Sequence, residues 1–268
     1  MKQDSWNFNQ AKLSIIVPVF NEGPNIITNL QLLLTEVERH FSNFEVIVVS
    51  DGSTDTTNSR LLAFRHPGMK PILFEHNAGK GNAVRAGFQR ASGDFILFID
   101  GGMEIHPKEI RIFMGLMALY HCDIVIGSKR HPQSQVDYPW HRRALSAIFQ
   151  YLVRALFHVN VTDTQVGIKL FRKPVIDAIL PYLEINRYGF DLEILSLAKM
   201  KGFDSVLEAP IRLDYFYNNS RFVATELMHV FKVGYSLLRD TLLLYARIRK
   251  LRSMEAVAST PEVTKRAS

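Results

Sequence analysis

The sequence contains very little cysteine and, at its start, no long apolar run. Cys122 is the single cysteine among 268 residues, which excludes an intrachain disulfide and fits a reducing compartment. Residues 1–12 lack the apolar core of a signal peptide, so we expect no secretory signal. No internal repeat divides the sequence. These absences favour one large domain with appendages, held together by a hydrophobic core.

Acidic residues are the minority among the charged ones. Lys and Arg outnumber Asp and Glu by 32 to 26, so the net charge is +6 and the pI is about 9.4. This charge suits a nucleic acid, an anionic membrane surface or a phosphorylated substrate. The basic residues gather in residues 129–143 and near the C-terminus, without the interleaved aromatic residues typical of nucleic-acid binders. We therefore expect no nucleic-acid partner, and a nucleic-acid or phosphoprotein binder is the alternative that charge alone would favour.

Short apolar runs alternate with segments of helical periodicity along the first half of the sequence. The predicted strands are residues 13–19, 44–50, 71–76, 95–100, 122–128, 168–171 and 206–216. The predicted helices are residues 26–40, 56–65, 81–91, 107–120, 144–157, 187–201 and 223–252. This alternation predicts an α/β fold with a mostly parallel sheet covered on both faces. In such sheets, ligands bind beyond the carboxyl ends of the strands.

Polar residues follow the first two predicted strands. Pro18 to Glu22 fits a turn, but a turn explains Glu22 less well than a ligand contact at the sheet edge does. Asp51 directly follows the second strand, where it is well placed to bind a base or a ribose. Asp55 fits a simpler role as the N-cap of the next helix.

A glycine-rich loop, NAGKG (residues 77–81), precedes the third helix. A dinucleotide fingerprint needs a third glycine where Val84 stands, and a P-loop needs Ser or Thr where Gly81 stands. Both motifs are therefore excluded. The loop can still offer its backbone N–H groups and Lys80 to a phosphate at the helix N-terminus.

The order of these motifs resembles that of family 2 glycosyltransferases of the GT-A fold. The resemblance is carried by VPVFNE, VVSDGSTD, NAGKGNAVRAG, ASGDFILFID and DIVIGSKR, and it covers residues 12–216. YPWHRRALSAIFQYLVRALF and DTQVGIKLFRK narrow it to the branch with dolichyl-phosphate mannose synthase, dolichyl-phosphate glucosyltransferase and bacterial polyprenyl-phosphate sugar transferases. This resemblance implies a Rossmann-like sheet flanked by helices. It also implies an inverting transfer of a sugar from a nucleotide sugar to a polyprenyl phosphate.

The resemblance places the donor at the strand ends. The implied nucleotide-binding residues are Pro18, Phe20, Glu22, Asp51 and Lys80. In this family the fourth strand ends in Asp-x-Asp, whose carboxylates hold a divalent metal on the diphosphate leaving group. Here Gly102 replaces the second Asp, which puts metal dependence in question. Glu104 shares a side of an extended chain with Asp100, so we expect these two acids to hold Mg²⁺ or Mn²⁺. A helix cap is the simpler alternative for Asp100.

A phosphate acceptor needs cationic clamps and no general base, because it is largely dianionic at neutral pH. The resemblance assigns this role to Arg130 and Arg142, which we expect to act in catalysis beside Asp100, with Arg143 as a further clamp. A solvated basic loop is the competing interpretation of Arg143 and Lys129.

Four further polar residues allow more than one interpretation. Asp163 and Gln165 either orient the sugar or the acceptor, or cap their own turn. Asp191 and Glu193 lie two residues apart on a predicted helix and therefore point in different directions. We expect them to pack and to anchor loops rather than to form a catalytic pair. The Gln-x-x-Arg-Trp motif of processive synthases is absent, which favours a single transfer.

Residues 223–252 are predicted to form an amphipathic helix that lies on a membrane surface. Arg239 and Asp240 would cost about 5–7 kcal/mol at the centre of a bilayer, while the apolar residues around them return roughly 2–4, so spanning is disfavoured. The expected apolar stripe contains Leu227, Phe231, Leu238, Leu242 and Tyr245, and the expected headgroup contacts are Arg247, Arg249, Lys250 and Arg252. Packing against the protein's own core, or against a second subunit in a homo-oligomer, is the alternative.

These interpretations divide the sequence into three parts. Residues 1–222 form the expected catalytic domain, residues 223–252 the surface helix, and residues 253–268 a disordered tail. We expect the protein to be cytoplasmic and to lie peripherally on the cytoplasmic face of a membrane. Two alternatives stay open: a family 2 transferase that acts on a glycan or lipid hydroxyl, and a non-catalytic GT-A relative. The retained Glu22, Asp51, Lys80 and Asp100 argue against the second.

Overall fold

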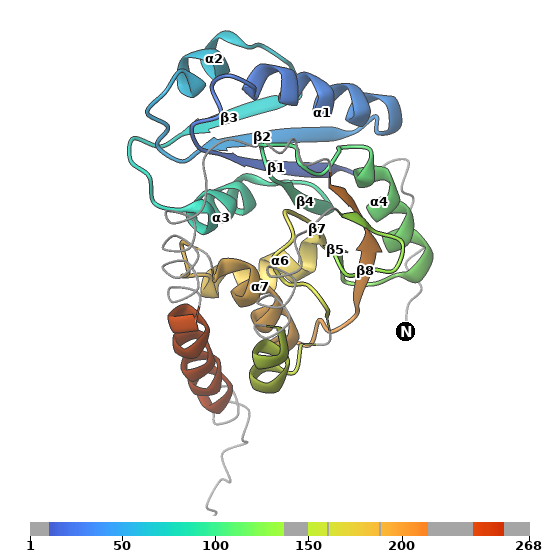
Figure 1. The fold of residues 1–268 in the computed structure, drawn as a ribbon, viewed down its shortest axis with the longest axis vertical. Helices are drawn as coiled ribbons and strands as arrows, with labels where there is room; N and C mark the ends of the chain where they lie inside the picture. Colours follow the sequence, from blue (N-terminus) through green and yellow to red (C-terminus); the bar gives the residue numbers. More distant parts are fainter. Residues whose placement is uncertain (1–10, 137–149, 160, 188, 214–237, 255–268) are drawn as a thin grey trace, which may run out of the picture.

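A single seven-stranded sheet organises the chain (Figure 1). The computed structural model describes residues 11–136, 150–159, 161–187, 189–213 and 238–254. The strands are β1 (Leu13–Val19), β2 (Phe44–Ser50), β3 (Met69–Leu73), β4 (Phe95–Ile99), β5 (Ile124–Ser128), β7 (Ile168–Arg172) and β8 (Val206–Pro210). Their order across the sheet is β3-β2-β1-β4-β7-β5-β8. A small second sheet pairs β6 (Gln135–Val136) with β9 (Arg212–Leu213).

The sheet is parallel except at one strand. β1 pairs in parallel with both β2 and β4, and β7 runs antiparallel between β4 and β5. The chain leaves β1 toward β2 and β3 on one side and then returns to β4 on the other side. This reversal of strand order opens a crevice at the carboxyl ends of β1 and β4, where a ligand can bind. The predicted mostly parallel α/β sheet is confirmed.

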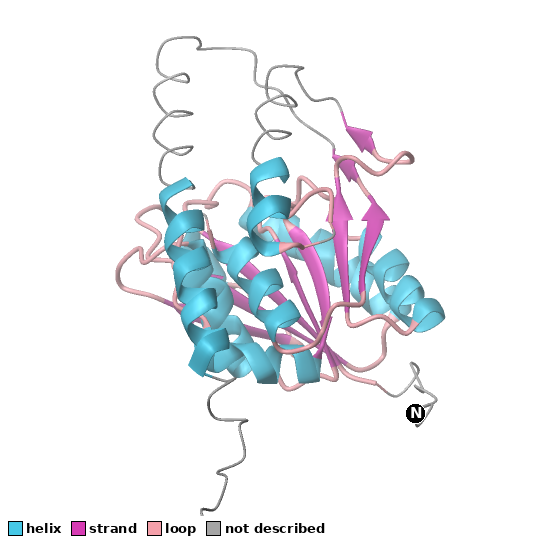
Figure 2. Cartoon of the chain, turned by 90° about the horizontal axis from the view of Figure 1, so that it is seen from below, coloured by secondary structure: helices cyan, strands magenta, loops and turns pink. Residues whose placement is uncertain are grey.

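Helices cover both faces of the sheet because each strand places apolar side chains on both sides. The helices are α1 (Ile26–His40), α2 (Thr57–Ala63), α3 (Lys80–Arg90), α4 (Glu109–Tyr120), α6 (Lys173–Ile179) and α7 (Phe190–Met200). One core cluster joins α1, α2 and α4 to the sheet, and a second joins α3, α6 and α7. Figure 2 shows the strands lying between these helical layers.

Two predicted strands end earlier than expected. β3 stops at Leu73, and residues 74–76 leave the sheet because their backbone turns to pass Gly52. Gly52 has a φ of +68°, and a Cβ atom there would lie 2.3 Å from the Asn77 nitrogen. The predicted strand 206–216 divides at Pro210 into β8 and β9, which belong to different sheets. Its residues 214–216 lie outside the described residues.

The described part of the C-terminal helix, residues 238–254, packs against the domain, beside α7 in Figure 1. Leu244 and Ile248 are 2% exposed and join the second core cluster, whereas Leu238, Leu242 and Leu243 are 42–58% exposed. Part of the predicted apolar stripe, with Leu227 and Phe231, lies outside the described residues. No helix in the described ranges combines the length and the apolar character that crossing a bilayer requires.

Candidate functional site

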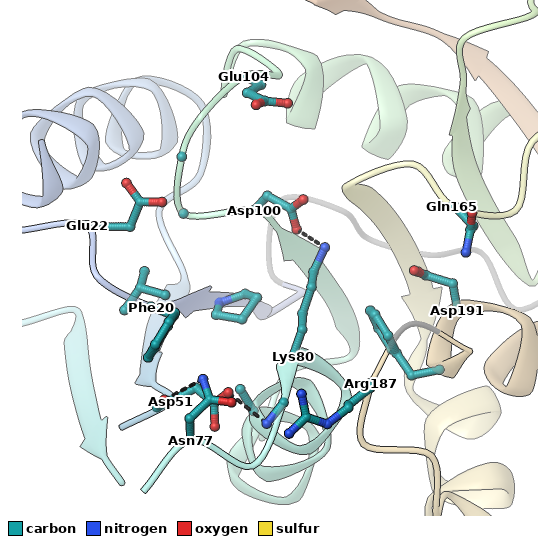
Figure 3. A pocket seen from close by; sticks show the side chains of 17 residues that line it. Phe20, Glu22, Asp51, Asn77, Lys80, Asp100, Glu104, Gln165, Arg187 and Asp191 are labelled. Atoms are coloured by element: carbon teal, nitrogen blue, oxygen red, sulfur yellow. Dashed lines mark hydrogen bonds and ion pairs between the residues drawn. The ribbon is translucent and has the colours of Figure 1, made fainter. Parts of the chain in front are cut away.

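A cavity of about 650 Å³ opens at the carboxyl ends of β1, β2 and β4 (Figure 3). Its walls come from the turn after β1, the end of β2, the start of α3, the turn after β4, the segment before β7 and the start of α7. The polar and charged side chains that line it are Glu22, Asp51, Asn77, Lys80, Asp100, Glu104, Gln165, Arg187 and Asp191. Pro18 and Phe20 also line it, so the structure brings together all five predicted nucleotide-binding residues.

Asp51 organises the glycine-rich loop as well as facing the cavity. Its two carboxylate oxygens accept the backbone N–H groups of Ala78 and Gly79 at 2.9 and 2.8 Å. The side chain of Asn77 donates to the Asp51 carbonyl oxygen at 3.1 Å. Asp51 is only 3% exposed, because the loop folds over it. A change at this position therefore disturbs the loop as well as any ligand contact.

Backbone N–H groups of the glycine-rich loop are hydrogen-bonded within the protein. The Asn186 carbonyl oxygen accepts the N–H of Gly81 at 2.8 Å and that of Asn82 at 3.4 Å. Together with the two N–H groups held by Asp51, these bonds occupy donors that we expected to face a phosphate. That expectation was wrong for the three of these groups that belong to the loop, those of Ala78, Gly79 and Gly81, because the loop is bonded to Asp51 and packed against residues 185–187. The Lys80 side chain, in contrast, lines the cavity.

Lys80 and Asp100 form an ion pair at the centre of the cavity (Figure 3). The Lys80 Nζ lies 2.5 Å from Asp100 Oδ1, and it also lies over the rings of Phe98 and Phe190 at 5.9 and 5.6 Å. Burial alone would lower the pKa of Lys80, but the charges of Asp100 and Asp191 outweigh burial and raise it. Lys80 is therefore a permanent cation at neutral pH, next to the acid that ends β4.

Two glycines fit closely around Asp100. The Asp100 N–H donates to the Gly167 carbonyl oxygen at 2.9 Å, and a Cβ at Gly167 would lie 2.3 Å from Asp100 Oδ2. A Cβ at Gly101 would lie 2.3 Å from the Val19 side chain. At Gly102 the nearest atom is Glu22 Oε1, at 3.7 Å. The position of the missing family Asp is therefore open enough to accept a side chain.

Three acids converge around this turn. Burial, followed by the charges of Asp55, Glu104 and Asp100, raises the pKa of Glu22 above its ordinary value. Glu104 is exposed at the rim, beyond the two glycines from Asp100 (Figure 3). Carboxylates that repel one another suit a bound cation. The described residues contain no group of three or more His, Cys, Asp or Glu side chains placed to hold a metal, so other oxygen ligands would have to come from the substrate.

The wall opposite the β1 turn contains a buried ion pair that the sequence did not reveal. Lys169 is fully buried, and its Nζ lies 2.5 Å from Asp191 Oδ1 and 2.7 Å from the Val166 carbonyl oxygen. It also lies 5.0 Å from the centre of the Phe98 ring. Asp191 lines the cavity, so its expected role as a packing residue was incomplete. The DTQVGIKLF segment contained Lys169, but nothing local marks a strand lysine as the partner of a helix aspartate.

In the turn before β7, Asp163 and Gln165 lie in different surroundings. The Asp163 carboxylate accepts the N–H groups of Gln165 and Lys129 at 3.2 and 3.3 Å, and Asp163 is 2% exposed. The Lys129 Nζ lies 3.6 Å from the same carboxylate. Asp163 thus holds the turn and the start of the basic loop, while Gln165 lines the cavity. Arg142 and Arg143 lie outside the described residues, and Arg130 does not line this cavity.

Asp55 is not the N-cap residue of α2, which is Thr56, but it lies directly before it. Its carboxylate accepts the N–H of Thr57, the first residue of α2, and that of Gly23, both at 2.9 Å. Arg187 is a cavity residue that the sequence analysis missed. It precedes α7 in RYGFDLEIL, far along the sequence from the glycine-rich loop against which it lies. A Cβ at Gly79 would lie 2.9 Å from the Arg187 Cγ.

A Rossmann-like sheet with an acidic turn after β4 and a cavity at its carboxyl edge defines a GT-A glycosyltransferase fold. Residues 14–180 match the family described as Glycosyl transferase family 2, and the chain belongs to this family. It is 34% identical to Dolichyl-phosphate beta-glucosyltransferase of Drosophila melanogaster over 70% of this chain and 63% of the relative. It is 30% identical to the human protein of the same name over 72% of this chain and 65% of the relative. The chain thus matches just under two thirds of these relatives' lengths.

Solved structures agree on the fold. Glucosyl-3-phosphoglycerate synthase from Mycobacterium tuberculosis, in complex with Mn²⁺, UDP and phosphoglyceric acid, superposes with a TM-score of 0.65 at 18% identity. The match covers 88% of this chain and 79% of that one. A second complex of the same synthase, with Mn²⁺, UDP-glucose and phosphoglyceric acid, has a TM-score of 0.66 over 88% of this chain and 80% of that one, at 18% identity.

Proposed function

We propose that this protein transfers a sugar from a nucleotide sugar to a polyprenyl phosphate, with inversion at the anomeric carbon. The observation that supports this most is the Lys80–Asp100 pair in a cavity at the carboxyl edge of the sheet. The dolichyl-phosphate glucosyltransferases that the chain resembles support the acceptor class. Their names also favour glucose as the sugar.

The donor occupies the cavity in this proposal. The nucleotide lies along Pro18, Phe20, Glu22 and Asp51, where a half-exposed aromatic ring, a half-buried carboxylate and a buried one meet. Its diphosphate lies toward Lys80 and Arg187, whose positive charges offset its negative charge.

A divalent metal fits this site if the donor completes its coordination. Asp100 and Glu104 would hold Mg²⁺ or Mn²⁺. The pKa of Glu22 is raised first by burial and then by neighbouring carboxylates, whose negative charge such an ion would offset. When bound, the ion would neutralise charge that develops on the departing diphosphate. Lys80 lies beside Asp100, so its positive charge would add to the neutralisation of the diphosphate.

The acceptor phosphate approaches from the side of the basic loop. Arg130, Arg142 and Arg143 are its proposed clamps. Of the residues that line the cavity, Gln165 is the nearest in the sequence to this basic loop, residues 129–143. No base is needed, because the phosphate is already ionised. Replacement of Arg130 or Arg142 with Lys keeps the charge and loses the planar fork. The KM for the acceptor should therefore rise while donor binding stays normal, and the reverse pattern would remove these residues from the acceptor site.

One observation favours a second candidate function. Asp191 places a carboxylate in the cavity wall, and a hydroxyl acceptor would need such a group as general base. Burial raises the pKa of Asp191, which suits a base, but the Lys169 partner opposes this role because it occupies Oδ1 of the carboxylate and acts to lower that pKa. Replacement of Asp191 with Asn separates the two functions. Transfer to a polyprenyl phosphate should keep most of its kcat, whereas transfer to a hydroxyl acceptor would be lost.

We also propose that the protein binds the cytoplasmic face of a membrane through its C-terminal helix. The exposed Leu238, Leu242 and Leu243 support this location. Arg247 does not, because it is paired within the protein, contrary to its predicted contact with headgroups. Replacement of the three leucines with serine should abolish sedimentation with anionic liposomes and leave the protein folded. If liposome binding persists and a dimer dissociates instead, the helix is a subunit interface.

The deciding experiment is a product assay with a panel of UDP- and GDP-sugars and with undecaprenyl or dolichyl phosphate as acceptor. We expect one sugar nucleotide, first UDP-glucose, to yield a lipid-linked sugar. Product formed only on a glycan or lipid hydroxyl would replace the proposed acceptor. Absence of product together with absence of nucleotide binding by calorimetry would favour the non-catalytic alternative.

A further inference from the structure

The C-terminal helix reaches the cavity wall through a buried carboxylate. Glu193, on α7, is fully buried, and its two oxygens accept the backbone N–H groups of Glu184 and Ile185 at 3.0 and 2.9 Å. Arg247, from residues 238–254, donates to Glu193 Oε1 at 2.5 Å. Its other nitrogen donates to the Tyr182 carbonyl oxygen and lies 3.2 Å from the Glu184 carboxylate. One arginine thus joins the helix to the first part of a short loop, at Tyr182 and Glu184.

That loop, residues 182–187, is also bonded to the start of α3. The Asn186 carbonyl oxygen accepts the Gly81 N–H at 2.8 Å, and the Leu183 carbonyl oxygen accepts from Arg85 at 2.9 Å. Contact is so close that a Cβ at Gly81 would lie 2.4 Å from the Ile185 carbonyl oxygen. The position of α3, and with it of Lys80, therefore depends on where this loop lies.

A contribution to stability alone does not explain why Glu193 and Arg247 are buried together. Removing two charges from water costs several kcal/mol each, and a buried pair rarely repays more than this cost. The Glu193–Arg247 pair does fix the position of the loop, because two backbone N–H groups and one carbonyl oxygen of the loop bond to these two side chains. This geometry lies directly before Arg187 and against the residue that follows Lys80.

We infer that Arg247 and Glu193 are positioning residues for the donor site, and that they act through residues 182–187 to hold Lys80 and Arg187 against the diphosphate. This inference rests on the proposed function only in naming the diphosphate as the ligand. It makes the C-terminal helix a part of the donor site, in addition to any contact of its outer face with a membrane.

The test compares three variants of the full chain: Arg247→Met, Arg247→Lys and the control Lys250→Met. Lys250 is exposed on the same helix, so its loss removes the same charge without touching the loop. Two measurements are made well below the melting temperature. Hydrogen exchange of residues 79–85 and 182–187 reports on the loop without any ligand, and calorimetry with UDP and UDP-glucose reports on donor binding.

We expect Arg247→Met to raise exchange in both segments, to leave β1 and β2 protected, and to weaken UDP binding about tenfold. Arg247→Lys should recover part of this loss, since it restores one contact of the fork, and Lys250→Met should match the parent chain. Because Arg247→Met removes the partner of a buried carboxylate, it can fail to fold; Arg247→Lys then decides, with the same pattern at smaller size.

Two results would overturn the inference. One is faster exchange at residues 182–187 with unchanged nucleotide affinity, and the other is equal loss of protection throughout the sheet. If the parent chain binds neither UDP nor GDP while Arg247→Met still loosens both segments selectively, the structural link holds and the proposed donor is wrong. Recovery of affinity in Arg247→Lys without recovery of exchange would also contradict the mechanism.

Discussion

Replacement of Gly167 with Ala should nearly abolish sugar transfer while leaving the fold intact. The added Cβ would lie 2.3 Å from Asp100 Oδ2 and 2.6 Å from Asp100 Cγ, whereas ordinary contacts begin near 3.4 Å. The atom that must move is the end of a side chain and not backbone, so the cost in stability is small. The carboxylate that moves, however, is the acid proposed to hold the divalent metal on the diphosphate of the donor.

The size of the effect follows from the displacement. The carboxylate must shift by about 1 Å, and a misplacement of this size costs on the order of 100-fold in rate. That corresponds to about 2.7 kcal/mol of lost transition-state stabilisation. Rotation of Asp100 also breaks its contact with Lys80. We expect kcat to fall by this factor, with the unfolding midpoint in urea within about 0.3 M of the parent value.

Gly102→Ala is the matched control. It adds the same methyl group two residues beyond Asp100, where the nearest atom is 3.7 Å away, so activity should stay within about threefold of the parent. The assay is product formation at saturating donor and acceptor, with urea unfolding of each variant measured in parallel. Full activity in Gly167→Ala would refute the role of Asp100, and equal losses in both variants would show that the turn, not the carboxylate, is at fault.

Three other predictions concern the acids of the fold. Asp51→Ala should weaken nucleotide binding and also lower the free energy of unfolding by about 2 kcal/mol, because two loop N–H groups lose their acceptor; calorimetry and urea unfolding measure both, and an unchanged nucleotide affinity would remove Asp51 from the site. Glu104→Gln should raise the half-saturating Mn²⁺ concentration several-fold, and Gly102→Asp in that background should partly restore it; full activity of the parent chain in EDTA would refute the metal proposal. Although burial alone would raise it, Lys70 and two serine hydroxyls hold the pKa of Glu45 well below its ordinary value of 4.5. This carboxylate therefore stabilises the fold above pH 4.5 and loses that effect as the pH falls, so Glu45→Gln should cost about 2 kcal/mol at pH 7 and progressively less toward pH 3; a cost independent of pH would contradict the assignment.

Local pattern was sufficient for the elements and for one edge of the site. Continuous apolar runs predict buried strands, and the carboxyl ends of parallel strands share one edge, so residues such as Glu22, Asp51 and Asp100 had to meet there. The glycines of the loop also excluded two phosphate-binding motifs by their spacing alone. These conclusions needed only the period of the pattern and the rules of strand connection.

Only the tertiary structure decided what lies opposite that edge. β7 enters the sheet antiparallel beside β4, which brings Gly167 against Asp100 and Lys169 under Phe98. α7 brings Asp191 and the preceding Arg187 into the cavity from nearly 90 residues further along the chain than Asp100. Such contacts are set by which strand lies next to which, and no local period encodes this.

The C-terminal helix shows the same division. Its amphipathic pattern predicts a helix with an apolar face over residues 223–252, of which residues 238–252 are described and helical. A pattern identifies an apolar face without identifying what covers it. Leu244 and Ile248 are covered by the domain, while Leu238 and Leu242 on the same helix are exposed. Arg247, which we predicted to contact headgroups with the other basic residues, forms an ion pair with the buried Glu193 instead. A buried acid attracts whichever cation the fold brings within reach, and only the packed chain determines that choice.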